Sequence, residues 1–335
     1  MSVAHAFSPK EFQVWIVSDA TNAGDTGLHA SNMKQLDVDS VGFPTLNLNQ
    51  VLDVRSGIGR TFKDEDFFQD NKLRVTEFTI SGNLHNDDGH KLLAQNICND
   101  VSGDIAVASG YTGTSQKYGA AVTNAASSLT VVIRPSDHTN QRSIEIAGCV
   151  VTNFSITADT GTEGGRYKFS ATLQSGKVPD LNESAVDSGE PTAGGTAYVN
   201  TDLPLLSSAT DFKVKNIDVV MASFTATIDL PAVFTGATST GYEVVSRGSE
   251  IAVTVDTQIK YDGETKILPH SFDTQTAATS GNMFVITNNN AFGVDVQNGV
   301  LTNVAFSEGD IMMLDCSIKS VDDGTDPLIS FDVTS

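Results

Sequence analysis

Residues 75–84 read Val-Thr-Glu-Phe-Thr-Ile-Ser-Gly-Asn-Leu. Apolar and polar side chains alternate along this stretch, with Phe78 and Ile80 on one face and Thr79 and Ser81 on the other. A period of two residues is typical of a strand that buries one face and leaves the other in solvent. The pattern therefore predicts a half-buried β-strand, and the rest of the chain can be compared with it.

A second stretch with the same pattern begins 175 residues later. There Val253 and Val255 alternate with Thr254 and Asp256. The polar turns that follow the two stretches are also similar, Asp-Asp-Gly at 87–89 and Asp-Gly-Glu at 262–264. Repeats are sought first because they decide how a chain divides into domains.

The likeness continues with changed spacing. Residues 149–153 correspond to 299–303 with an offset of 150, and the strand around Phe169 corresponds to that around Leu314 with an offset of 145. We predict one domain present twice: domain 1 over 1–177, a Pro- and Gly-containing linker over 178–211, and domain 2 over 212–335. A long loop near 102–128 explains the shortened offset. A single sandwich with repetitive patterning is the alternative.

One helix is predicted, near 89–99, with Asp88 as its N-cap. Its apolar stripe consists of Leu92, Leu93, Ile97 and Cys98. The matching segment in the second copy should be shorter, because Pro269 interrupts it. The expected class is therefore all-β with a minor helix, in two tandem domains.

The net charge of −21 argues against a tight, sequence-independent grip on DNA, which requires Lys and Arg against phosphate. The charge is uneven. Residues 1–177 carry 14 basic and 19 acidic side chains (net −5), and residues 178–335 carry 6 and 22 (net −16). Solubility is the simplest explanation of such a charge, and a surface that must not hold DNA is another.

No catalytic or cofactor-binding motif is found. His85 and His90 flank an acidic turn, but their spacing matches no standard metal-ligand set. The acidic runs at 64–66 and 322–326 lack the full spacing of a calcium loop. The three cysteines suit neither a disulfide framework nor a metal pair. We expect no enzyme activity, no cofactor and no metal, and we recognise neither a signal peptide nor a membrane span.

Residues 43–48, Phe-Pro-Thr-Leu-Asn-Leu, followed by 53–60, Asp-Val-Arg-Ser-Gly-Ile-Gly-Arg, resemble the opening strands of the tail tube (major tail) proteins of siphophages. The strand pair 148–156 and 167–175 resembles the one that closes the sheet in that family. The segment 310–331 resembles the end of such subunits. The likeness is one of pattern over most of the chain, and no single motif in it is diagnostic.

The resemblance implies that each of the two tandem domains is a β-sandwich, and that its sheet joins those of neighbouring subunits into a ring-shaped β-barrel. It implies six domains per ring, and hence a homotrimer of this duplicated chain with pseudo-sixfold symmetry. Rings would stack into a helical tube in the virion tail, whose lumen conducts double-stranded DNA during genome ejection. The subunit would be made in the host bacterial cytoplasm. Its partners would be other copies and the tape measure, terminator and tail-tip proteins, with no membrane.

The polar strand faces are the predicted lining of this lumen, the alternative being a face that is simply solvated. The candidates are Thr79, Ser81, Asn83, Asn153, Ser155, Thr254, Asp256, Gln258, Asn303 and Asp315. Arg55 and Arg60 are predicted to form ion pairs between subunits. The segments 1–40, 102–128 and 178–211 are predicted to bridge rings because they depart from the repeat.

Three other functions stay open at this point. The chain could be another virion part, such as a tail terminator, a baseplate ring or a head-decoration protein. It could be a carbohydrate-binding β-sandwich adhesin, although one Trp and six Tyr leave little aromatic surface for sugars. It could also be a β-sandwich hydrolase, for which no convergent set of acids or nucleophiles is recognisable.

Overall fold

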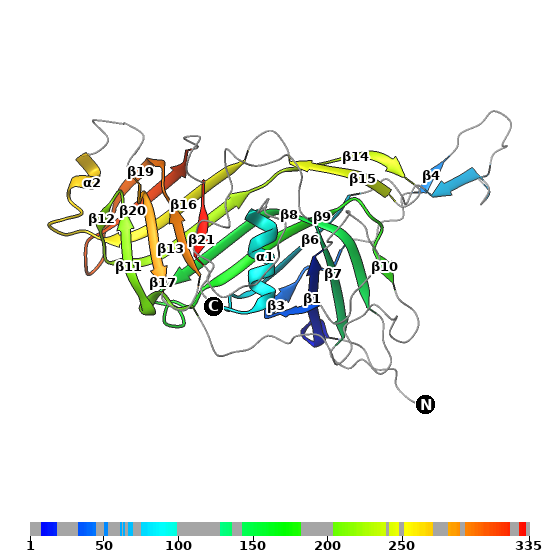
Figure 1. The fold of residues 1–335 in the computed structure, drawn as a ribbon, viewed down its shortest axis with the longest axis horizontal. Helices are drawn as coiled ribbons and strands as arrows, with labels where there is room; N and C mark the ends of the chain where they lie inside the picture. Colours follow the sequence, from blue (N-terminus) through cyan, green and yellow to red (C-terminus); the bar gives the residue numbers. More distant parts are fainter. Residues whose placement is uncertain are drawn as a thin grey trace.

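The structure, a computed structural model, describes residues 8–18, 33–44, 50–52, 61, 63, 66–69, 75–98, 128–135, 143–181, 204–238, 241–247, 251–270, 281–288, 292–321 and 328–332 (Figure 1). This part of the chain is mostly antiparallel β-structure with two α-helices. The predicted all-β class with a minor helix is therefore confirmed. None of the described helices is long and apolar enough to cross a membrane.

Eight strands lie side by side in one long antiparallel sheet, which belongs to a larger 12-stranded sheet. Their order across it is β3 (Val38–Val41), β6 (Thr76–Asn83), β9 (Lys168–Ser175), β8 (Ile144–Asp159), β13 (Met221–Asp229), β16 (Ala252–Lys260), β20 (Met313–Ser320) and β19 (Gly299–Ser307). The first four come from the N-terminal half and the last four from the C-terminal half. The strands β8 and β13 join the two groups.

Strand β8 serves two sheets because it bends. Gly148, at φ 66°, adopts a left-handed conformation that favours glycine, and the register with β7 shifts beside it. Before the bend, β8 pairs with β7 (Leu129–Pro135) and β10 (Asp180–Leu181); after it, with β9 and β13. Strand β1 (Phe12–Ser18) continues the layer between β7 and β2 (Lys34–Leu36). Helix α1 (Asp88–Cys98) contacts β1, β2 and β8.

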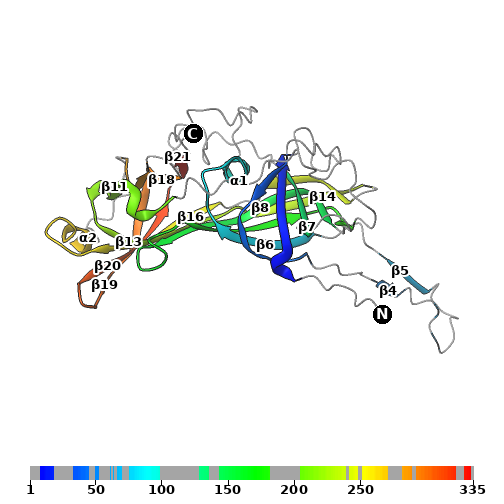
Figure 2. The same ribbon diagram turned by 90° about the horizontal axis from the view of Figure 1, so that it is seen from below.

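A five-stranded sheet covers the C-terminal half of the long sheet. Its order is β12 (Ile217–Asp218), β11 (Ala209–Val214), β17 (Phe284–Asn288), β18 (Gly293–Val296) and β21 (Ser330–Asp332). Aromatic rings join the layers: the centroids of Phe224 and Phe284 lie 5.9 Å apart, and those of Phe154 and Phe331 6.1 Å apart. Figure 2 shows α1 and this small sheet on the same side of the long sheet, so the long sheet has one covered face.

The pairing scheme of β11–β21 repeats that of β1–β10. In each half the first strand lies between the second strand and the one after the helix: β1 between β2 and β7, β11 between β12 and β17. The equivalents of the bent strand β8 are two strands, β18 and β19, separated at Gln297–Asn298. Each half also inserts a two-stranded hairpin, β4 (Gln50–Leu52) with β5 (Phe67–Gln69), and β14 (Ala232–Thr238) with β15 (Gly241–Arg247).

The irregularities repeat as well. The β8–β9 pairing shifts register between Val151 and Asn153, and the β19–β20 pairing shifts between Leu301 and Asn303. At the first shift the Thr152 hydroxyl donates to the carbonyl of Thr172 at 3.3 Å. At the second, the Thr302 hydroxyl donates to the carbonyl of Ser317 at 3.2 Å. Shared bulges are stronger evidence of equivalence than alternation, because each interrupts the ladder at one defined place.

These registers agree with the offsets of 150 and 145 but not with the offset of 175. Thr79 lies opposite Thr172, and the residue opposite Ser317 is Asp256, so the offset between β6 and β16 is 177. The sequence comparison is therefore two residues wrong at this strand. The cause is the period of two, since a slip by two residues leaves every side chain on the same face.

The helix prediction needs two corrections. The capping residue of α1 is Asp87 rather than Asp88, because the Asp87 carboxylate accepts the His90 backbone N–H at 2.9 Å. Helix α2 (Ile267–His270) is short, as predicted, but it contains Pro269 instead of ending before it. Proline is tolerated there because the N–H groups of a first helical turn have no partner within the helix.

Two of the segments predicted to bridge rings contribute strands and short helices. The 3-10 helix η1 (Pro9–Glu11) and strand β1 lie within the segment 1–40, and β1 is fully paired with β7. Strand β10, the 3-10 helix η4 (Leu206–Ser208) and the start of β11 lie within the predicted linker. The long loop near 102–128 falls almost wholly outside the described residues.

Candidate functional site

The uncovered face of the long sheet carries the polar half of each alternating pattern. Its residues face one another across neighbouring strands. Thr79 lies opposite Thr172, Ser155 lies opposite both Ser170 and Thr227, and Asn303 lies opposite Ser317. Because residues directly opposite each other point to the same side of a sheet, these side chains form one continuous polar surface across all eight strands.

This polar face contains nine of the ten predicted lining residues in partly or fully exposed positions. They are Thr79, Ser81, Asn153, Ser155, Thr254, Asp256, Gln258, Asn303 and Asp315. Asn83 is the exception, because it is only 8% exposed and donates to the Asp37 carboxylate at 3.3 Å. Arg55 and Arg60 lie outside the described residues.

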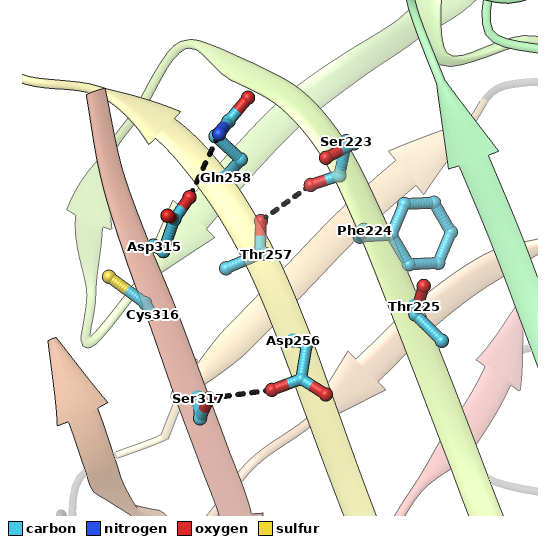
Figure 3. Close-up of a pocket in the computed structure, with 9 residues that line it drawn as sticks. All are labelled: Ser223, Phe224, Thr225, Asp256, Thr257, Gln258, Asp315, Cys316 and Ser317. Atoms are coloured by element: carbon cyan, nitrogen blue, oxygen red, sulfur yellow. Dashed lines mark hydrogen bonds between the residues drawn. The ribbon is translucent and has the colours of Figure 1, made fainter. Parts of the chain in front are cut away.

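A shallow groove on this face runs between β13, β16 and β20 (Figure 3). Two of its carboxylates accept hydrogen bonds from the adjacent strand. Gln258 donates to Asp315 at 2.9 Å, and the Ser317 hydroxyl donates to Asp256 at 2.6 Å. The groove therefore offers a water-facing acidic surface whose charges are held in place by amide and hydroxyl groups.

Strand β13 is the element that the sequence comparison missed. It lies at the centre of the long sheet and pairs with β8 on one side and β16 on the other. Phe224 and Ala226 are buried, whereas Thr225 and Thr227 lie on the polar face. The alternation of residues 221–229 carries the same period-two signal as 75–84, so this strand could have been found from the sequence.

The polar face is weakly acidic and rich in neutral groups. Its charged residues, placed by strand alternation, are the carboxylates Glu77, Asp159, Asp229, Asp256 and Asp315 and the lysines Lys168, Lys260 and Lys319. Lys168 lies 3.5 Å from the Glu163 carboxylate. A surface on which carboxylates outnumber ammonium groups gives phosphate little to bind, and it repels a polyanion weakly.

The two buried histidines form structural contacts with carboxylates. His85 Nε2 lies 2.6 Å from Asp37, and His90 Nδ1 lies 2.7 Å from Asp87. Burial by itself raises the pKa of Asp37. The hydrogen bonds from His85 and Asn83, together with the positive charge of Arg166, outweigh burial and leave that pKa below its usual value. This cluster anchors the chain segment before β3 against the turn after β6.

Within the described ranges, no group of three or more His, Cys, Asp or Glu residues is arranged to hold a metal ion. Burial, with a smaller contribution from the Asp315 carboxylate, raises the pKa of the Cys316 thiol to about 12. Such a thiol is a poor nucleophile at neutral pH, because the thiolate is the reactive form.

No protein-family model and no curated protein sequence matches this chain.

Proposed function

We propose that this protein is the structural subunit of a siphophage tail tube. In this proposal the chain contains two tandem tube-type domains, three chains close a ring of six such domains, and rings stack into a tube whose lumen conducts DNA. The observation that carries the proposal is the junction of β8 with β13. There two similarly paired groups of strands already share one continuous sheet.

Ring closure would pair the backbone groups at the two edges of this sheet. Among the described residues, β3 pairs only with β6 and β19 only with β20. Unpaired edges expose backbone N–H and C=O groups and invite uncontrolled pairing, and closing the sheet on itself removes them. A head-to-tail contact between identical chains closes into a ring when its rotation divides a full turn. The resemblance to siphophage tail tubes implies six domains per ring, so a chain with two such domains would close a ring of three chains.

The polar face suits the wall of a DNA conduit. It is open, it spans every strand of the long sheet, and its opposite face is covered by α1 and the small sheet (Figure 2). Its weak negative charge supports transit rather than retention, because the described residues of the face form no continuous row of Lys and Arg that could replace the counterions of DNA. In this proposal the protein is located in the virion, next to tape measure, terminator and tail-tip proteins.

Electron microscopy of the purified protein tests this function. We expect rings or hollow tubes in negative stain, and native mass spectrometry of a single ring should give three chains. A protein that stays monomeric when concentrated, and also when tail tips are added as initiators, contradicts the proposal. Six chains per ring would contradict the trimeric ring but not the proposed function as a tube subunit. Binding to a glycan array by a monomer would favour the adhesin.

A further inference from the structure

We propose that β19 of one copy pairs antiparallel with β3 of the next copy and with the two residues that follow β3, so that Phe306 lies directly opposite Phe43. This proposal rests on the function proposed above and adds the edges and the register. Its basis is the junction inside the chain, because β8 and β13 show how one four-strand group joins the next. The edge strand β19 is the counterpart of β8, and the edge strand β3 is the counterpart of β13.

The register at the junction is defined by backbone hydrogen bonds and by strand pairing. Leu230 N–H donates to Thr152 O at 2.8 Å, and Thr160 N–H donates to Ala222 O at 2.9 Å. Between these bonds, Ala226 lies directly opposite Ile156. In an antiparallel pair, every second pair of opposite residues exchanges both backbone bonds, and Ala226 with Ile156 is such a pair.

Both strands of the junction have a counterpart at a free edge. Adding 150 to the number of a β8 residue and 145 to that of its β9 partner reproduces the β19–β20 pairing, bulge included. Adding 183 to the number of a β3 residue and 177 to that of its β6 partner likewise reproduces the β13–β16 pairing. The counterpart of Ile156 is thus Phe306, and the counterpart of Ala226 is Phe43.

The side chains at the free edges are exposed where their counterparts are buried. Ile156 is 1% exposed and Phe306 52%; Ala226 is 2% exposed and Phe43 37%. Each phenylalanine packs edge-on against one ring of its own chain, Phe43 against Phe12 and Phe306 against Tyr261, and the part of each that stays exposed is apolar surface that pairing would bury. Residues 299–307 also contain neither a charge nor a proline, the usual protections of an edge strand.

The backbone of β3 is oriented for this partner. Gly42 N–H donates inward to Thr79 O at 2.7 Å. Because successive N–H groups of a strand point to opposite sides, those of Val41 and Phe43 point outward. Pro44, which has no N–H, follows at a position that faces β6, so the outer edge loses no donor to it.

A disulfide placed across the proposed seam tests the register. In a backbone-bonded antiparallel pair the Cα atoms lie about 5.5 Å apart, within the range that a disulfide bridges. We would combine Phe43→Cys with Phe306→Cys, assemble the protein under reducing conditions, oxidise it and separate the products on a non-reducing gel. The matched control combines Phe43→Cys with Val304→Cys, which lies on the same face two residues out of register. The single variants and the unmodified protein are oxidised in parallel.

The Phe43–Phe306 pair should form dimers and trimers about tenfold more efficiently than the control pair, because the control Cα atoms lie beyond disulfide range. Efficient cross-linking by Phe306→Cys alone would indicate symmetric β19–β19 pairing and overturn the proposal. If rings form and the Phe43→Cys, Val304→Cys pair cross-links better, the proposed register is wrong but the proposed tube function is not contradicted. Cross-linking into open chains without rings supports the seam and rejects the ring. An unmodified protein that forms neither rings nor tubes refutes the proposed function and this seam with it.

Discussion

Ile156 lies directly opposite Ala226 where β8 joins β13, and both side chains are buried. Their counterparts at the two ends of the long sheet, Phe306 and Phe43, are exposed. In the proposed ring, one chain therefore contains one completed junction, β8 with β13, and contributes one strand to each of two further junctions with its neighbours. This difference allows stability and assembly to be tested separately.

Ile156→Ala should lower the free energy of unfolding of the isolated chain by about 2–5 kcal/mol, because it removes buried methyl groups and leaves a cavity. Phe306→Ala should lower that free energy less, by about 0.5–1.5 kcal/mol, because its side chain is half exposed and its ring contacts only the Tyr261 ring edge-on among the aromatic pairs of the described chain. Urea unfolding of the dilute subunit measures both. Light scattering should show a higher assembly threshold for Phe306→Ala. An equal loss of unfolding free energy in the two variants would contradict the asymmetry between inner and outer junction.

A heavy-atom label on the polar face should appear inside the tube. Thr79→Cys, labelled with a small gold maleimide, should place density in the lumen, because Thr79 is exposed on that face. Thr210→Cys is the matched control: it is also an exposed threonine, but it lies on β11 of the covering sheet. Electron microscopy reads out the positions. Gold from Thr79 on the outer rim would mean that the polar face is the outside of the tube.

A lysine on the polar face should slow the passage of DNA. Thr227→Lys places an ammonium group between Ser155 and Thr254 at the centre of the sheet, where phosphates would pass in the proposed conduit. Ejection from particles built with this variant should be slower by several-fold, and added salt should relieve the delay as it screens the charge. Thr210→Lys is the control with the same added charge. Unchanged ejection kinetics for Thr227→Lys would mean that the polar face does not line the path of the DNA.

The Asp37 carboxylate should make stability depend on acidic pH. Its pKa is lowered below the usual 3.8 in the folded chain, so it stabilises the fold above that pH, and the stabilisation is lost as pH falls through the folded pKa. Asp37→Asn should therefore lower the urea midpoint at pH 7. The gap from the unmodified protein should shrink below pH 3.8. Asp39→Asn, an exposed neighbour, is the control, and a gap independent of pH would contradict the role of the Asp37 charge.

The Cys316 thiol should resist alkylation in the folded protein at pH 8, because its pKa of about 12 keeps it protonated and its side chain is buried. Peptide mapping after iodoacetamide treatment, with and without urea, measures this. Thr210→Cys supplies an exposed thiol as the positive control. Rapid native labelling of Cys316 would show that β20 opens readily from the sheet.

Several elements could be predicted because local chemistry decides them. The alternation in 75–84 and the apolar stripe of 92–97 each recur with the period of the structure they form, β6 and α1. The repeat was predicted on the same basis. Its offset at β6 was not determined, because alternation is unchanged by a slip of two residues, and only pairing with β9 and β20 distinguishes 175 from 177.

By itself, the sequence determined the class of fold, the helix, and the polar and apolar halves of its strands, since each depends on side chains a few residues apart. Tertiary structure alone decided which strands are neighbours. The join of β8 to β13 and the contact of Asp37 with His85 both unite residues distant along the chain, and the order of strands leaves β3 and β19 with one partner each among the described residues. Strand pairing depends on backbone hydrogen bonds, which nearly every residue type supplies alike, and the Asp37–His85 contact joins side chains 48 residues apart, so no local pattern records either.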